Sequence, residues 1–291
     1  MDTRALTLFL SLSETLHFGR TSDQHHISAS ALSRTIKQLE ETLGVTLFER
    51  DNRKVTLTPQ GRLLQSYARE TLQSWDTLRE TLMQESQELQ GEISIYCSVT
   101  ASYSFLYDIL SDFRQRHPRI ELKLHTGDPA PAIQRVINGH EDIAIAARPD
   151  NLPSSVAFRR IAVSPLVFIA PIQASDNLPQ FNVKTGPDWA NIPMIVSEEG
   201  IGRDRVDSWF KRLGISPKIY AQVAGHEAMV SMVSLGFGIG VVPRIVLDNS
   251  PLADKVQILN QSSQDSLGHY DVGLCTLEKR LKSPIIKAFW N

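Results

Sequence analysis

The hydrophobic pattern of this 291-residue chain changes its period at Gly91, and that change constrains the fold most strongly. Before Gly91, apolar residues recur at spacings of three and four, which place them on one face of a helix. After it, short apolar runs alternate with helical segments, a rhythm typical of parallel sheets covered by helices. We therefore expect a mainly helical part over residues 1–90 and an α/β part over residues 91–291.

Two short helices are expected in the first 27 residues. One covers residues 3–16 and the other residues 21–26, with a break at Phe18 and Gly19 between them. The apolar face of the first helix has spacings of three and four and consists of Leu6, Phe9, Leu10, Ser13 and Leu16.

A third helix is expected to begin after Ser28, whose hydroxyl can cap it, and to end at Gly44. Its buried stripe consists of Leu32, Ile36, Leu39 and Leu43. The opposite face carries small and basic side chains: Ala29, Ser30, Ser33, Arg34 and Lys37. A small, hydrogen-bonding helix face fits the major groove of DNA, where base edges carry a readable donor and acceptor pattern. The alternative is a three-helix unit without a nucleic-acid partner.

A β-wing is expected next, with strands over residues 46–48 and 55–57. Three cations near its tip, Arg50, Arg53 and Lys54, are suited to phosphate contact. Residues 1–60 hold seven acidic and seven basic side chains, so this unit lacks the usual basic excess of a DNA-binding domain. Binding by one such unit should be weak, and two or more copies are expected to act together.

A long helix over residues 59–90 is expected to link the two parts, with Thr58 as its cap and Pro59 as its first residue. Its apolar positions alternate in steps of four and three, with Glu85 as an interruption, and are Leu64, Ala68, Thr71, Trp75, Leu78, Leu82 and Leu89. Roughly 30 helical residues span about 45 Å and outreach a 60-residue domain. We therefore favour a dimer seam over a helix packed on its own domain.

Two lobes are expected in the α/β part: residues 91–162 with 269–291, and residues 163–268. The expected strands cover residues 93–97, 120–124, 143–146, 166–170, 194–196, 219–221, 240–242 and 272–275. Helices are expected to end near residue 116, to cover 130–138, 203–213 and 227–235, and to open at Ser283 and Pro284. A ligand would bind in the cleft, where strands end and helices begin.

Hydroxyls and helix starts gather at these strand ends, namely Ser98, Thr100, Ser102, Gly225, His226 and the segment from Ser197 to Gly200. Helix N-termini bind anions, and hydroxyls add hydrogen bonds without adding charge. A small carboxylate with hydroxyl or keto groups fits this chemistry. For Thr100, capping alone explains the residue equally well.

The chain shows none of the catalytic motifs sought in its sequence. His226 and Glu227 are not followed by a second histidine at the metalloprotease spacing, because Val230 stands there. We expect no cofactor, no metal site, and two reduced core thiols at Cys97 and Cys275. Without a secretory signal or an apolar run of about 18 residues, the chain is expected to work in the cytoplasm and to have no membrane partner.

The N-terminal motifs resemble those of the LysR-type transcriptional regulators. They cover residues 27–40 (ISASALSRTIKQLE), 43–50 (LGVTLFER) and 57–61 (LTPQG). The resemblance implies a winged helix-turn-helix over residues 1–58, a linker helix, and an effector domain of the type 2 periplasmic-binding fold. It also implies a homotetramer built as a dimer of dimers, double-stranded operator DNA as a partner, and RNA polymerase as a further one.

Three residues depart from the family pattern: Thr21 and Ser22 replace alanines, and His25 replaces an aliphatic residue. A buried histidine without a partner would be costly, so the packing of the second helix is open.

The effector domain is most similar to the family members that control branched-chain amino acid synthesis. Residues 97–101, 126–128 and 225–233 carry this resemblance, which implies an acetohydroxy acid as the inducer. Asp128 stands at a cleft position in the family. Because its charge would oppose a carboxylate, three roles stay open: capping the next helix, accepting a ligand hydroxyl, or holding a cation.

Overall fold

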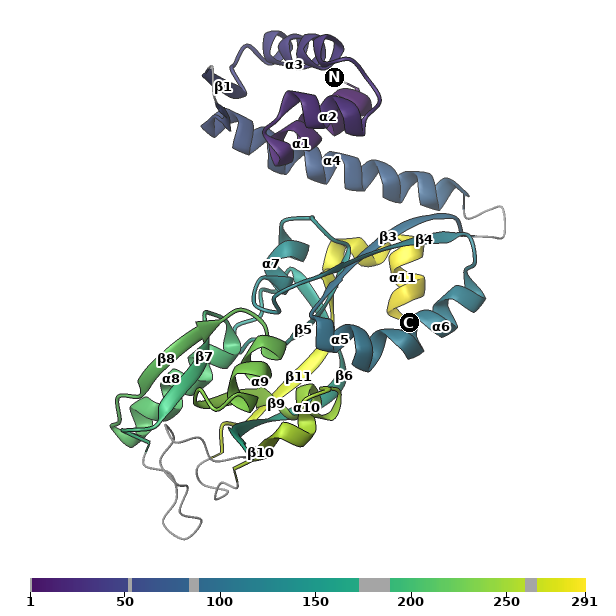
Figure 1. Cartoon of the computed structure of the whole chain (residues 1–291). Coiled ribbons are helices and arrows are strands. Elements are labelled where there is room, and N and C mark those ends of the chain that lie inside the picture. Colours follow the sequence, from purple (N-terminus) through teal and green to yellow (C-terminus); the bar gives the residue numbers. More distant parts are fainter. Residues whose placement is uncertain (1, 52–53, 84–88, 173–188, 260–265) are drawn as a thin grey trace. The chain divides into compact units, whose positions relative to one another are not determined.

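The computed structural model describes residues 2–51, 54–83, 89–172, 189–259 and 266–291. These fall into two compact units, residues 1–86 and 87–291 (Figure 1). None of the helices within the described ranges combines the length and apolarity needed to span a membrane.

The first unit consists of three helices, a two-stranded wing and a long helix. The helices are α1 (Thr3–Thr15), α2 (Phe18–Gln24) and α3 (Ala29–Leu43). The wing strands β1 (Phe48–Asp51) and β2 (Lys54–Leu57) are antiparallel, and α4 (Pro59–Met83) follows. The core joins α1, α3, the start of the wing and α4 through fully buried Phe9, Leu12, Leu32, Ile36, Leu47 and Ala68. The expected winged helix-turn-helix is confirmed.

Two local expectations for the first helices are wrong. Phe18 and Gly19 do not separate the two helices but are the first residues of α2. The helix can begin there because the His17 imidazole Nδ1 caps it by accepting a hydrogen bond from the Arg20 N–H. In α1, Leu8 and Leu12 are also buried, and Leu10 is partly buried against the same core, whereas Leu16 does not belong to the buried face. Because the helix ends at residue 15, Leu16 takes a left-handed conformation and lies exposed.

The helix α4 serves its own domain in its first half. Leu64 and Ala68 are buried in the core of the first unit, so these two positions of the expected dimer seam are wrong. Leu89 is wrong as well, because it lies beyond the end of α4 and packs against the core of the second unit. Glu85 lies outside the described residues. The apolar side chains of Trp75, Leu78 and Leu82 are exposed, as a seam requires.

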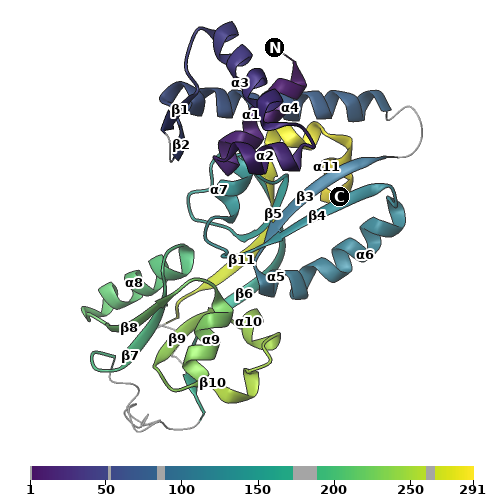
Figure 2. The ribbon, with the colours of Figure 1, turned by 45° about the horizontal axis from the view of Figure 1, so that its top comes forward.

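The second unit is built on one nine-stranded sheet that runs through two lobes (Figures 1 and 2). In the first lobe, β3 (Gly91–Cys97) pairs in parallel with β4 (Ile120–Thr126) and β5 (Ile143–Ala147). In the second lobe, β7 (Pro193–Ser197) pairs in parallel with β8 (Lys218–Val223) and β9 (Ile239–Pro243).

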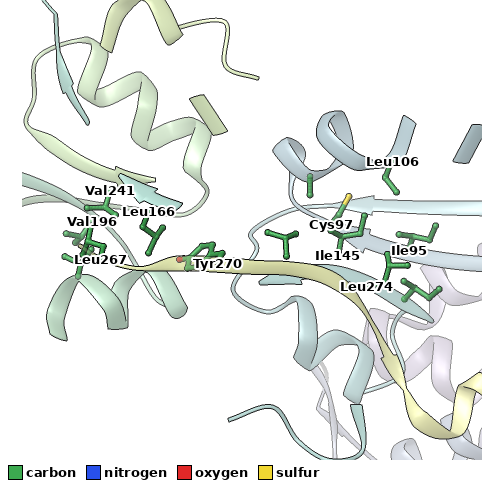
Figure 3. Packing of buried hydrophobic residues seen from close by; sticks show 14 of the residues in the cluster. Ile95, Cys97, Leu106, Ile145, Leu166, Val196, Val241, Leu267, Tyr270 and Leu274 are labelled. Carbon is green, nitrogen blue, oxygen red and sulfur yellow. The ribbon is translucent and has the colours of Figure 1, made fainter. Parts of the chain in front are cut away.

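Two long antiparallel strands join the lobes. They are β6 (Val156–Pro171) and β11 (His269–Leu277), which pair with one another and also with β9 and β5 respectively. The expected strand over residues 166–170 is only the second half of β6, which also pairs with β10 (Val256–Ile258), a strand that the sequence did not indicate. Figure 3 shows Tyr270 on β11 between the buried residues of the two lobes.

Helices cover the sheet at the expected places. The helices of the first lobe are α5 (Val99–Ala101), a π-helical turn (Ser102–Leu106), α6 (Tyr107–Arg116), α7 (Ala132–Ile137) and α11 (Pro284–Trp290). Those of the second lobe are α8 (Ile201–Leu213), α9 (His226–Ser234) and α10 (Arg244–Asp248). The segment from Val99 to Arg116 is therefore helical without interruption. The free thiols of Cys97 and Cys275 lie in the core, as expected.

Candidate functional site

The outward face of α3 carries the side chains expected to read DNA. The Ser28 hydroxyl accepts a hydrogen bond from the Ala31 N–H at 3.1 Å, so the predicted cap is confirmed. Because Leu32, Ile36 and Leu39 hold the opposite face in the core, Ala29, Ser30, Arg34 and Lys37 are exposed and Ser33 is half-buried. Lys37 reaches Glu41 at 3.6 Å, and both side chains are largely exposed, so solvent competes with this pair.

The wing is held at the end of α3 by a carboxylate that sequence reasoning did not single out. Glu40 Oε1 accepts hydrogen bonds from the backbone N–H groups of Leu47 at 2.7 Å and Phe48 at 3.2 Å. The Thr58 hydroxyl, at the start of α4, contacts the carbonyl oxygens of Thr46 at 2.8 Å and Leu47 at 3.2 Å. These contacts fix where β1 begins relative to α3.

The cations of the wing are described only in part. Lys54 is exposed and stands opposite Asp51 in the β1–β2 ladder. Arg53 and the side chain of Arg50 lie outside the described residues, so their phosphate contacts stay a prediction.

The departures from the family pattern in α2 have polar partners. Thr21 is fully buried, and its hydroxyl lies 2.6 Å from that of Thr15. The Ser22 hydroxyl donates to the Gly19 carbonyl at 2.8 Å. His25 is half-buried at the C-terminal end of α2 rather than in the core. The helix therefore avoids the penalty of unsatisfied buried polar groups.

A cavity of about 280 Å³ lies between the two lobes of the second unit. Four of the residues expected at an effector site line it, namely Asp128, Ser197, Gly225 and His226. Gly200, the last residue of the expected segment 197–200, lines it as well. Gly202 and Tyr270 also line it, and the sequence did not single these two out. The residues around Tyr270 show no sequence pattern that would indicate its place in the cleft, because that place depends on the path of β11 between the lobes.

The second lobe turns two uncapped helix ends toward this cavity. Gly200 precedes α8 and Gly225 precedes α9, both with positive φ and neither with a side-chain cap. A Cβ atom on Gly200 would lie 3.0 Å from the Ala130 Cβ of the other lobe, so a larger residue would hold the lobes apart. The first backbone N–H groups of both helices thus remain available to an anion.

Two neutral donors stand beside these helix ends. Burial lowers the pKa of His226 below its ordinary value, while the nearby carboxylates of Glu227 and Asp128 oppose the shift. Burial also raises the pKa of the Tyr270 hydroxyl. This hydroxyl sits over Gly202, where a Cβ atom would be only 2.7 Å away, and it makes no hydrogen bond to a residue that the structure describes. A ligand oxygen in the cavity could accept this hydrogen bond.

Asp128 does not cap α7, because the N-cap residue of this helix is Pro131 and makes no side-chain hydrogen bond. The Oδ1 of Asp128 accepts a hydrogen bond from the Ala130 N–H at 2.7 Å, in the turn before α7. Its carbonyl oxygen accepts one from the Tyr96 hydroxyl at 2.8 Å. Within the described residues, no cluster of three or more His, Cys, Asp or Glu side chains could hold a metal ion.

The structure does not bring Ser98, Thr100 and Ser102 to this cavity. Ser98 caps α5 by accepting from the Ala101 N–H at 3.2 Å, and the Ser102 hydroxyl donates to the Val99 carbonyl at 2.6 Å. Thr100 is bound instead to Glu227 of α9, in the other lobe. The helix start at the end of β3 thus uses its hydroxyls within the protein.

Two family models match the chain. The model described as "Bacterial regulatory helix-turn-helix protein, lysR family" matches residues 3–62, and "LysR substrate binding domain" matches residues 86–291. The chain is 47% identical to the HTH-type transcriptional activator IlvY of Salmonella typhimurium and to the HTH-type transcriptional regulator IlvY of Escherichia coli. Both alignments cover 100% of this chain, and 99% and 98% of the respective relatives.

Solved structures share the fold of the whole chain. The LysR family transcriptional regulator CbnR has a TM-score of 0.65, and a full-length variant of OxyR from Pseudomonas aeruginosa has one of 0.70, each at 20% sequence identity. Both alignments cover 99% of this chain, with 96% of CbnR and 93% of OxyR. A structure of full-length CbnR complexed with its target DNA matches with a TM-score of 0.64 at the same identity.

Proposed function

The chain belongs to the LysR family and is a DNA-binding transcriptional regulator, and from this premise we propose that it controls branched-chain amino acid synthesis in response to an acetohydroxy acid. The observation that carries this proposal is its 47% identity to IlvY over the full chain. The cavity chemistry supports it, because two open helix N-termini and two neutral donors suit a small carboxylate that bears hydroxyl and keto groups.

For DNA, we propose that α3 enters the major groove with Ser28 at its cap. Ala29, Ser30, Ser33 and Arg34 would face base edges, while Lys37, Arg50, Arg53 and Lys54 would contact phosphates. The exposure of this face and the anchoring of the wing by Glu40 support the assignment. The net charge of zero over residues 1–60 means that one unit binds weakly and that copies cooperate.

For the effector, we propose that its carboxylate binds the open end of α8 or α9 in the second lobe. Tyr270, Ser197 and His226 would donate to its hydroxyl and keto oxygens, and Asp128 would accept from its hydroxyl. Of the first-lobe residues expected here, Ser98 and Ser102 would act only by shaping the start of α5.

For assembly, LysR regulators act as oligomers, and we propose a dimer of dimers. An exposed apolar stripe on α4 supports a seam along this helix and consists of Leu63, Tyr67, Trp75, Leu78 and Leu82. The effector would change the lobe arrangement, and with it the spacing of the DNA-binding pairs and the bend of the promoter. This requires unequal affinity for the two arrangements. RNA polymerase would then be a further partner, and the cytoplasm the place of action.

The experiment that tests the function is binding to the DNA upstream of the acetohydroxy acid isomeroreductase gene, with and without acetolactate, at fixed salt. We expect sequence-specific binding and a footprint that acetolactate changes. Arg34→Ala should lower the discrimination at one base pair by about 1–3 kcal/mol. The matched variant Lys37→Ala should weaken all sequences alike.

Equal affinity for this DNA and for scrambled competitor would refute the proposed control of branched-chain amino acid synthesis. A footprint that is specific but unchanged by acetolactate would refute only the proposed inducer. If Arg34→Ala weakened all sequences equally, Arg34 would be a phosphate contact.

A further inference from the structure

A buried tyrosine of the first lobe holds one wall of the cavity between the lobes. Tyr96 lies on β3 and is 5% exposed, and its hydroxyl donates to the carbonyl oxygen of Asp128 at 2.8 Å. Burial raises the pKa of this hydroxyl, although the Arg135 guanidinium opposes the shift, so the group is a neutral donor near pH 7. The cavity is lined by Asp128 and the two residues that follow it, but not by Tyr96. Any influence of Tyr96 on a ligand therefore passes through the turn of residues 127–130.

This turn rests directly on the Tyr96 hydroxyl. A Cβ atom added to Gly127 would overlap the hydroxyl oxygen and would lie 3.3 Å from the ring carbon that bears it. The Gly127 N–H also donates to the carbonyl oxygen of Cys97 at 3.1 Å. Neighbouring residues of β3 thus fix the turn at two successive positions, one by a side chain and one by the backbone.

The turn presents a carboxylate oxygen and a lobe contact to the cavity. One oxygen of Asp128, Oδ1, is engaged by the Ala130 N–H at 2.7 Å. The other oxygen, Oδ2, makes no hydrogen bond to a residue that the structure describes. Ala130 packs closely against Gly200 of the second lobe, since a Cβ atom there would lie 3.0 Å from the Ala130 Cβ. The position of the turn therefore decides where Oδ2 stands when the lobes meet.

An ion pair holds the Tyr96 ring in place. The guanidinium of Arg135, on α7, lies over the ring with its Cζ 4.7 Å from the ring centroid. Its Nε and Nη2 donate to the two oxygens of Glu141 at 2.9 and 2.6 Å, and the Glu141 side chain is 1% exposed. The His125 imidazole Nδ1 lies 3.0 Å from Glu141 Oε1 as well. Because a bidentate pair fixes the guanidinium plane, the ring has little freedom to carry its hydroxyl away from Asp128.

We propose that Tyr96 is a positioning residue that makes the cavity selective for acids bearing a hydroxyl group. This rests on the proposed function in one respect, namely that Asp128 accepts a hydrogen bond from the effector hydroxyl. The Tyr96 hydroxyl fixes the turn, and the turn fixes Asp128 Oδ2 at the place where that hydroxyl arrives. A site built to hydrogen-bond a hydroxyl rejects the analogue that lacks it, because its polar group is then left unpaired.

The expected effect follows from the loss of one hydrogen bond. Without the Tyr96 hydroxyl the turn takes other positions, and affinity falls with the fraction of molecules that keep Asp128 in place. A neutral hydrogen bond changes such a fraction about fivefold, so Tyr96→Phe should weaken acetolactate binding about fivefold. The binding of 2-methylacetoacetate, which lacks the hydroxyl, should change less than about twofold, because this ligand makes no use of Asp128 Oδ2.

The first experiment is calorimetry of both ligands with the full-length protein. Tyr220→Phe is the matched control, because it removes the hydroxyl of an exposed tyrosine that does not line the cavity. Asp128→Asn keeps an oxygen for the Ala130 N–H but replaces the second acceptor by a donor, so it should lose the same preference for acetolactate. Adding Tyr96→Phe to Asp128→Asn should then change the ratio of the two affinities no further.

The second experiment needs no ligand. Gly127→Ala should lower the urea midpoint, because its Cβ atom collides with the Tyr96 hydroxyl. In the Tyr96→Phe background the same substitution should cost less, because the colliding oxygen is absent. This coupling between the two positions is the signature of a turn that rests on the hydroxyl.

Equal weakening of both ligands by Tyr96→Phe would overturn the proposal, because a purely structural residue would give that result. An unchanged ratio of affinities, or strictly additive losses in the urea experiment, would overturn it too. If acetolactate bound neither the wild type nor Tyr96→Phe, the proposed inducer would fail and the hydroxyl selectivity with it. That outcome is distinguishable, because the urea experiment still decides whether Tyr96 holds the turn.

Discussion

Gly61 offers the sharpest test of how the DNA-binding unit is held together. It lies in the first turn of α4, and a Cβ atom added there would be 2.3 Å from the Leu47 carbonyl oxygen and 2.7 Å from the Leu57 side chain. Contacts between non-bonded carbon atoms are optimal near about 3.5–4.0 Å, so the backbone before the wing would have to move by about 1 Å. This close approach therefore explains why the LTPQG motif has a glycine at position 61.

The cost of Gly61→Ala follows from the groups that would move. Overpacking costs about 1–3 kcal/mol. The same shift strains the hydrogen bonds that Thr58 makes with Leu47 and Gly61, each of about 1 kcal/mol. The better helix propensity of alanine returns about 1 kcal/mol. We expect the free energy of unfolding of the first unit to fall by about 3 kcal/mol. Operator binding should also be lost, because Leu47 directly precedes the first strand of the wing.

The assay is urea unfolding followed by far-ultraviolet circular dichroism, together with operator binding by fluorescence anisotropy. Gly44→Asn is the control, since Gly44 has a φ of +69° and a Cβ atom added there would meet no other atom within 4 Å, and asparagine tolerates that conformation. The free energy of unfolding of Gly44→Asn should be less than about 1 kcal/mol below that of the wild type. A Gly61→Ala variant as stable as the wild type, with normal operator binding, would refute the reasoning.

Three further predictions concern the second unit. Burial raises the pKa of the Cys97 thiol to about 11 and that of Cys275 to about 12, so both should resist Ellman's reagent in the native protein at pH 8 and react after denaturation; reaction of the native thiols would contradict their burial. The folded-state pKa of His226 is lowered, so its stabilising contribution is complete above about pH 6.5 and is lost as the pH falls from there through the folded-state pKa. The urea midpoint of the wild type should therefore fall more than that of His226→Gln between pH 7 and pH 5, and parallel curves would count against a lowered pKa at His226. Tyr270→Phe should weaken acetolactate binding about tenfold and leave the urea midpoint unchanged, because the hydroxyl has no partner among the described residues; unchanged affinity would remove Tyr270 from the effector site.

The amino-acid sequence determined the local elements and the family. Ser28 and Gly44 mark the ends of α3 because a cap and a left-handed terminus act on neighbouring backbone groups. The helical stripes and the short strands follow from burial of one face, which a short window of sequence records. The motifs around α3 and the start of α4 identified a LysR-type regulator, since they combine these local constraints in a fixed order.

The tertiary structure alone decided what each surface of these elements touches. Leu64 and Trp75 occupy equivalent positions in the apolar pattern of α4, yet Leu64 is buried in its own domain and Trp75 is exposed. The difference arises because the core that includes α1 covers the helix at Leu64 but not at Trp75. Tyr270 enters the cleft because β11 returns between the lobes. Thr100 meets Glu227 only after the chain has crossed between lobes. The spacing of apolar residues shows which face of a helix or strand is buried. Contacts between distant elements depend instead on the path of the whole chain, which no short segment of sequence records.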